Sequence, residues 1–382
     1  MSNNVFYMNC TASAPHIGCL AVTDFHIESL ISEGYTIKDI EYADCGWQKL
    51  WKGSINSSLN ALEDSRLLKR IRANDAVVIN GEGTLHNSAG AGMLIVAKIA
   101  KREGKKVYLV NTSAYHLGES AELLKSIDRI NIREMRSSKY LKSKNIDHDV
   151  ILDSLLGANF NNIITHDYQG RVIVMDWHPN RDRDVGKSLL PLVSDDSMDF
   201  LPLNHYAHLE DWRSTVANLR TADLVVTGRY HGVYLAGLAG VPFVTLPSNT
   251  DKIQGLLDAT KLPLKVTSIR DINKDIDLAR NNKSLYKEFS HYLYSQLPLQ
   301  TFAALIDGSP SRQVKPTDGE KQERINEVEN RMALARRTSQ MKQLQDTITQ
   351  RVGYTGLKHI KDDFRKTIGR LKRNISSIIR EQ

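Results

Sequence analysis

The chain has 382 residues, of which 41% are hydrophobic and 25% charged, and its formal net charge is +7. These fractions are typical of globular proteins, and the length predicts two domains rather than one core. The sequence contains no run of about 18 apolar residues and no basic-then-apolar leader at its start, so we expect neither a membrane span nor a secretory signal. Three cysteines without metal-ligand spacing predict a reduced, cytoplasmic setting and no metal site.

The positive charge is concentrated in the C-terminal region. Residues 311–382 contain 17 Lys and Arg against 9 Asp and Glu, which leaves the preceding 310 residues with a net charge near −1. A basic folded surface is the usual sign of a nucleic-acid-binding domain. We therefore expect no nucleic-acid partner.

Patterns typical of strands alternate with patterns typical of helices as far as about residue 305. The first series predicts strands at 5–8, 76–80, 106–111, 129–132 and 149–152, with helices at 20–32, 57–72 and 92–103. The second series predicts strands at 171–176, 199–203, 224–227, 243–246 and 264–266, with a helix at 212–221. This alternation predicts an α/β fold of two Rossmann-like domains, each with a parallel sheet, that face each other across a cleft.

The domain limits follow from composition. We predict an N-terminal Rossmann-like domain at 1–165 on the acceptor side and a C-terminal one at 166–308 on the donor side, then a Pro/Ser/Gly-rich linker at 309–319. Residues 320–382, with apolar residues three and four apart, are predicted to form a basic amphipathic helical tail. Three interpretations of this tail stay open: a coiled-coil or self-association seam, a helix on an anionic membrane surface, and a helix packed on the main body.

The most informative pattern follows the strand predicted at 224–227. Arg229, His231 and Gly232 lie between that strand and a small-residue helix that ends at Gly240. Ligands bind at the carboxyl ends of parallel strands, and the N–H groups of a helix start favour an anion. The alternative is an ordinary strand–turn–helix connection whose Arg and His are surface residues.

Polar residues also follow strands of the first series. Gly81 and Gly83 allow a close backbone approach on either side of Glu82, a candidate general base, and Thr84 follows them. Arg133 ends a later strand, and its guanidinium suits carboxylates and phosphates. The alternatives are a tight turn with an exposed Glu82, and a salt bridge or helix cap at Arg133.

Together these elements resemble the polysaccharide pyruvyl transferases over about residues 1–300. The matching segments are Gly81-Glu82-Gly83-Thr84-Leu85, Arg133-Glu134-Met-Arg-Ser137 with Asp153, Arg229-Tyr230-His231-Gly232 through Gly240-Val241-Pro242, and Lys252-Ile253. One segment departs from the family pattern. The first loop commonly has Asn-x-Gly-Asp, where this chain has His16-Ile-Gly18-Cys19.

The resemblance implies a GT-B-like enzyme that transfers the pyruvyl group of phosphoenolpyruvate to sugar hydroxyls as a ketal and releases phosphate. It implies phosphoenolpyruvate as co-substrate, no other cofactor and no metal. The acceptor would be a cell-surface glycan or a lipid-linked precursor, met at the inner membrane face if the tail binds there. His231 is then the candidate acid or base and Glu82 the base on the acceptor hydroxyl. The residues expected to bind substrate are Arg229, Arg133, Gly81, Gly83, Thr84, Gly232 and Lys252.

Two alternatives remain at this stage. A glycosyltransferase that uses a nucleotide sugar would place a diphosphate on Arg229, because a fold does not fix a function. A non-catalytic glycan-assembly scaffold that oligomerises through its tail would tolerate the loss of His231.

Overall fold

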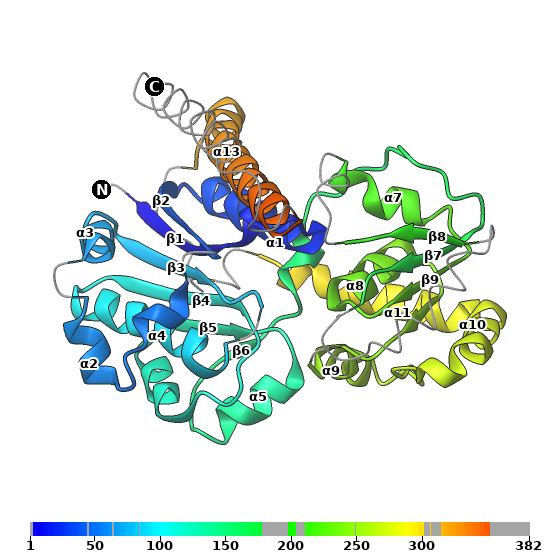
Figure 1. The fold of residues 1–382 in the computed structure, drawn as a ribbon, viewed down its shortest axis with the longest axis horizontal. Helices are drawn as coiled ribbons and strands as arrows, with labels where there is room; N and C mark the ends of the chain where they lie inside the picture. Colours follow the sequence, from blue (N-terminus) through cyan, green and yellow to red (C-terminus); the bar gives the residue numbers. More distant parts are fainter. Residues whose placement is uncertain are drawn as a thin grey trace. The chain divides into compact units, whose positions relative to one another are not determined.

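A computed structural model describes residues 3–43, 46–62, 65–83, 85–177, 198–203, 211–248, 250–301, 306 and 315–351. Its strands are β1 (Asn4–Cys10), β2 (Thr36–Tyr42), β3 (Ala76–Asn80), β4 (Lys106–Thr112), β5 (Arg129–Ile132), β6 (Asp149–Val150), β7 (Val172–Met175), β8 (Met198–Leu201), β9 (Leu224–Thr227) and β10 (Phe243–Thr245). The strands form two all-parallel sheets, ordered β2-β1-β3-β4-β5-β6 and β10-β9-β7-β8 (Figure 1). The predicted α/β class, GT-B-like in having two parallel sheets, is confirmed.

Helices connect the parallel strands. The α-helices are α1 (Ile17–Ser32), α2 (Ile55–Asn60), α3 (Arg66–Arg72), α4 (Asn87–Arg102), α5 (Met135–Lys142), α7 (Thr215–Leu219), α8 (Tyr230–Ala239), α9 (Lys252–Thr260), α10 (Ile272–Asn281), α11 (Lys283–Gln296) and α13 (Asp318–Arg351). Short 3-10 helices are η1 (Thr11–Ser13), η3 (Trp47–Leu50), η4 (Gly118–Ser126), η5 (Ser154–Gly157), η7 (Trp212–Ser214), η8 (Ile269–Asp271) and η9 (Leu297–Leu299).

The six-stranded sheet is covered on both faces. Alternate residues of a strand point to opposite faces, so Phe6 and Met8 of β1 enter a core with α4, which lies across the sheet in Figure 1. Val5 and Tyr7 enter a second core with α1 that continues into the four-stranded sheet. Both sheets therefore belong to one compact unit, residues 1–336.

Three differences between the predicted elements and the structure concern a whole helix or strand. The single helix expected at 57–72 is two helices, because the Ser65 hydroxyl accepts a hydrogen bond from the Leu68 N–H and starts a new one. The strand β2 was not predicted, since an edge strand is half-exposed and lacks a continuous apolar run. The strand expected at 264–266 is reduced to one bridge between Val266 and Thr245.

The tail begins as expected with a long helix. The Glu320 carboxylate and the Thr317 hydroxyl cap the start of α13 reciprocally. Val328 and Met332 are buried, and the Arg331 guanidinium donates to the Ile37 carbonyl oxygen. The part of α13 up to residue 336 thus packs on the main body. The last helix expected beyond residue 356 lies outside the described residues, and no helix within them is long and apolar enough to cross a membrane.

Candidate active site

The strand–turn–helix connection predicted around Arg229 is present. Arg229 is the last residue before α8. Its backbone N–H donates a hydrogen bond of 3.1 Å to the Thr227 hydroxyl at the end of β9. Gly232 is required on the first turn, because a Cβ there would lie 2.2 Å from the same hydroxyl oxygen. The start of α8 therefore packs directly on the end of β9, and its first residues stand at the carboxyl edge of the four-stranded sheet.

His231 lies close to two carboxylates, Glu82 and Asp153, which follow strands β3 and β6 of the six-stranded sheet. Its Nε2 atom lies 3.6 Å from Glu82 Oε1 and 3.5 Å from Asp153 Oδ2. The exposed fraction of these side chains is 10% for His231, 4% for Glu82 and 0% for Asp153. Within the described residues, His231 Nε2 and Glu82 Oε1 are buried without a hydrogen-bond partner. A buried donor and acceptor held just beyond bonding distance are available to a substrate.

The opposite edge of the His231 ring is enclosed by the first loop and α1. A Cβ at Gly18 would lie 2.2 Å from His231 Nδ1, so only glycine leaves room for this ring. The His16 ring packs edge-on against His231 with centroids 5.3 Å apart. Burial, with the charges of His231 and Arg229, lowers the pKa of His16 well below its usual value. His16 is therefore neutral at neutral pH.

Glu82 is held at the end of β3 by close backbone packing. A Cβ at Gly81 would lie 1.9 Å from the Thr112 hydroxyl oxygen, so the turn after β3 needs a glycine there. Glu82 Oε2 accepts a 2.5 Å hydrogen bond from the Thr11 hydroxyl. Gly83 follows with a φ of 93°, a conformation that favours glycine. Thr84, predicted to bind substrate, lies outside the described residues.

Arg133 is buried and fully engaged by protein groups. Its Nη1 bonds Asp153 Oδ2 at 2.6 Å, its Nε donates to the Ser113 hydroxyl at 3.0 Å, and its Nη2 donates to the Gly83 carbonyl oxygen at 2.5 Å. Burial lowers the pKa of Arg133, but Asp153, Tyr230 and Glu82 together outweigh burial, so the net pKa is raised. For Asp153, burial raises the pKa, but the charges of His231 and Arg133 outweigh burial and hold the pKa well below its usual range. The side chain of Arg133 is 1% exposed, which places it beneath the site rather than at its surface.

Lys252 begins α9 and reaches the same turn. Its Nζ donates to the Gly83 carbonyl oxygen at 3.2 Å and lies 5.7 Å from the centre of the Tyr230 ring. Burial, followed by the charge of Arg133, lowers the pKa of Lys252 to about 7. An anion beside this amine would reverse that shift, because opposite charge favours the protonated form.

Arg229 lies at the side of the site. Its Nη2 pairs with Asp176 Oδ2 at 3.0 Å, and its buried Nε has no partner among the described residues. The side chain is 20% exposed, in contrast to Arg133. Burial raises the pKa of Asp176 although Arg229 opposes this. Arg229 is thus the cation with both solvent access and an unused N–H.

The structure therefore gathers most of the predicted residues from four segments of the chain. Glu82, Gly83, Arg133, His231 and Lys252 are linked by the contacts above. Sequence reasoning assigned no role to His16 and Gly18, although the departure of their loop from the family pattern was visible. The structure places Gly18 one residue inside α1, where a glycine costs helix stability and needs a packing reason, but the helix predicted at 20–32 begins after it.

Comparison with known proteins agrees with the resemblance seen in the sequence. The family model described as polysaccharide pyruvyl transferase matches residues 28–250. The chain belongs to this family. No curated protein matches the chain.

Solved structures match at low identity. The spinosyn rhamnosyltransferase is 12% identical with a TM-score of 0.49, and the match covers 79% of this chain and 98% of that one. A UDP-N-acetylglucosamine 2-epimerase from Neisseria meningitidis, bound to UDP-GlcNAc, is also 12% identical with a TM-score of 0.47, covering 76% and 94% of the two chains. The enzyme of that name from Methanocaldococcus jannaschii is 12% identical with a TM-score of 0.44, covering 77% and 100%.

Within the described residues, no group of three or more His, Cys, Asp and Glu is arranged to hold a metal ion. The absence of a metal and of a cofactor in the reaction stays a prediction.

Proposed function

We propose that this member of the polysaccharide pyruvyl transferase family transfers the pyruvyl group of phosphoenolpyruvate to two hydroxyls of a sugar and forms a ketal. The sugar would belong to a cell-surface glycan or its precursor. The observation that carries the proposal is His231, whose unpartnered Nε2 lies between the carboxylates of Glu82 and Asp153. Imidazole is the side chain that most often serves as a general acid or a general base in enzymes.

The reaction needs three proton transfers and one leaving group. A proton added to the methylene carbon of phosphoenolpyruvate makes it a methyl group and leaves a cationic centre at the neighbouring carbon. A sugar hydroxyl attacks that centre and loses its proton, and a second hydroxyl replaces the phosphate, which leaves with the second hydroxyl proton. We assign His231 to the proton on the methylene carbon and Glu82, with its free Oε1, to the attacking hydroxyl.

Phosphoenolpyruvate carries a carboxylate and a phosphate on three carbons, so its site needs cations close together. We assign Arg229 and Lys252 to these anionic groups, because Arg229 has an unused N–H and Lys252 is the amine beside Gly83. Gly81 and Gly232 let the turn after β3 and the start of α8 pack on Thr112 and Thr227, which places backbone at the site, and Gly83 leaves open space beside that turn. The start of α8 supplies N–H groups to the anion. Arg133 acts differently: it holds Asp153 and the Gly83 carbonyl in place and is a positioning residue.

Binding of phosphoenolpyruvate tests the donor without knowledge of the acceptor. A ligand at about 100 times its dissociation constant stabilises a protein by about 2.7 kcal/mol, which a melting shift detects. We expect phosphoenolpyruvate to raise the melting temperature of the full chain, and Arg229→Ala to abolish the rise. Arg280→Ala is the matched control, since Arg280 also pairs with one aspartate, at 2.7 Å, and lies outside the site.

Each outcome decides between donors. A shift with nucleotides or nucleotide sugars alone would overturn pyruvyl transfer in favour of glycosyl transfer. No shift with any of these ligands, together with normal function of a His231→Ala variant in cells, would favour a scaffold.

The tail gives the acceptor side a second test. We propose that residues 309–382 hold the enzyme at an anionic membrane, where a lipid-linked acceptor would be met, because this region carries the excess positive charge. Vesicles that contain anionic lipid should sediment the full chain and not a chain that ends at residue 336, which keeps the part of α13 that packs on the main body. Equal sedimentation of the two forms would overturn this part of the proposal, and self-association would appear instead as a change in mass by light scattering.

A further inference from the structure

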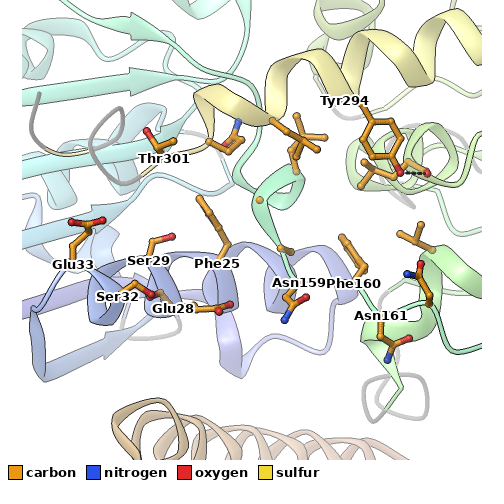
Figure 2. Close-up of a pocket in the computed structure, with 18 of the residues that line it drawn as sticks. Phe25, Glu28, Ser29, Ser32, Glu33, Asn159, Phe160, Asn161, Tyr294 and Thr301 are labelled. Carbon is orange, nitrogen blue, oxygen red and sulfur yellow. Dashed lines mark hydrogen bonds between the residues drawn. The ribbon is translucent and has the colours of Figure 1, made fainter. Parts of the chain in front are cut away.

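A second pocket lies along α1, away from the residues assigned above. Its volume is about 740 Å³, within the range of about 300–1,000 Å³ usual for small-molecule sites. The second half of α1, residues 156–162 and the end of α11 with the residues after it line the cavity (Figure 2).

The pocket and the active site lie at different positions along α1. Phe25, Glu28, Ser29 and Ser32 recur every three or four residues, so they form one face of α1 and point into the cavity (Figure 2). Gly18, which touches His231, precedes Ser29 by about 16 Å along the helix axis at 1.5 Å per residue. None of the residues assigned to the reaction lines the pocket.

The pocket presents aromatic rings that are fixed in place. The Tyr294 side chain is 41% exposed, yet its hydroxyl donates to the Leu238 carbonyl oxygen at 2.9 Å and anchors the ring (Figure 2). The Phe160 ring packs edge-on against Trp212 with centroids 5.6 Å apart. An exposed ring that does not have to be ordered on binding offers a flat apolar surface at low entropic cost.

One buried polar group in the lining lacks a partner. Gln300 is 8% exposed, and its Nε2 donates to the Leu152 carbonyl oxygen at 2.8 Å. That bond fixes the amide plane, but Oε1 has no hydrogen-bond partner among the described residues. Buried acceptors are nearly always satisfied, so this oxygen can accept a hydrogen bond from a donor that the described residues do not supply.

The two carboxylates at the pocket are paired with lysines, whereas the one arginine of the lining bonds a neutral group. Glu28 pairs with Lys321 at 3.4 Å and Glu33 with Lys315 at 3.1 Å. Arg220 donates to a neighbouring amide oxygen at 2.8 Å. The carboxylates therefore offer no excess negative charge to a cationic ligand. Most polar side chains of the lining are uncharged amides and hydroxyls, which suit the hydroxyl groups of a sugar.

We propose that this pocket binds an uncharged saccharide at a site separate from the reaction. A pyranose ring has an apolar face, which packs on Tyr294, and hydroxyl groups, one of which donates to Gln300 Oε1. The inference goes beyond the proposed function and does not depend on the pyruvyl donor. The protein would then have a second carbohydrate-binding site, which holds a sugar unit of the glycan other than the one that reacts.

Ligand-observed saturation-transfer NMR on the full chain tests this at millimolar affinity. The probes are the methyl glycosides of glucose, galactose, mannose and N-acetylglucosamine, with glucuronate and glucosamine as charged counterparts. Ser29→Trp fills the cavity and Tyr294→Ala removes the exposed ring. His291→Ala is the matched control, since it removes another exposed ring from α11 that does not line the pocket.

We expect saturation transfer to at least one neutral glycoside, its loss in Ser29→Trp and Tyr294→Ala, and its retention in His291→Ala. Transfer to no neutral glycoside, transfer to the charged sugars alone, or transfer that persists in both pocket variants would overturn the proposal. The phosphoenolpyruvate melting shift, measured on the same variants, should not change. That readout separates a failure here from a failure of the proposed function, and it shows that both variants are folded.

Discussion

The buried pair of Arg133 and Asp153 permits a sharp prediction about stability. Both side chains are essentially inaccessible, at 1% and 0% exposure, and their charged atoms are 2.6 Å apart. Asp153→Asn keeps the shape of the side chain and removes its charge. The Arg133 guanidinium then stays buried without its counter-charge, which typically costs about 3–5 kcal/mol. Set against an unfolding free energy of about 5–15 kcal/mol, this is a large loss.

The chain contains a matched control four residues away. Asp149 also pairs with an arginine, Arg129, at 2.9 Å, but it is 49% exposed. Such a surface pair contributes about 0–1 kcal/mol. Asp149→Asn should therefore be close to neutral, although residue type, partner and distance are similar. The two substitutions differ chiefly in burial.

Urea unfolding followed by circular dichroism measures both changes in unfolding free energy. The pKa of Asp153 is lower in the folded than in the unfolded chain, so its stabilisation is present above the unfolded value of about 4 and lost as the pH falls below it. The difference between wild type and Asp153→Asn should shrink accordingly in acid. Equal effects of the Asp153 and Asp149 substitutions at neutral pH, or a difference that does not change in acid, would refute the argument from buried charge.

Three other predictions concern the site and the helix beside it. Gly18→Ala should displace the His231 ring and weaken phosphoenolpyruvate binding in calorimetry at least about tenfold, while Gly319→Ala, where a Cβ meets nothing within 4 Å, should not. Because the pKa of Lys252 is about 7, sulfate binding should weaken by up to about tenfold per pH unit above pH 7, and Lys252→Arg should remove this dependence; an unchanged slope would exclude Lys252 from the anion site. Burial raises the pKa of Asp24 to about 6, so the folded chain binds more protons than the unfolded chain between about pH 4 and 6, and unfolding free energy should fall as the pH rises through that window. In urea unfolding, Asp24→Asn should reduce this dependence of the unfolding free energy on pH. A dependence equal to that of the wild type would contradict the prediction.

Local patterns were sufficient for most elements and for the candidate residues. The strand at Ala76–Asn80 and the turn before α8 were predictable because apolar runs, glycines and small-residue helices act over a few positions. The break between α2 and α3 depends on a single capping hydroxyl, which a helical pattern of apolar residues conceals. The edge strand β2 was missed because only part of it is buried.

The sequence by itself determined the α/β class, the family and the identity of the residues at the carboxyl ends of the strands, since these depend on local periodicity and on motifs of a few residues. Only the tertiary structure decided how those residues divide their roles. Arg133 and Arg229 both follow strands, yet one is enclosed with Asp153 and the other keeps an unused N–H. Likewise, the need for glycine at position 18 arises from the His231 ring, more than 200 positions away in the chain. Burial and contact at such separations are properties of the packed molecule, and no local pattern encodes them.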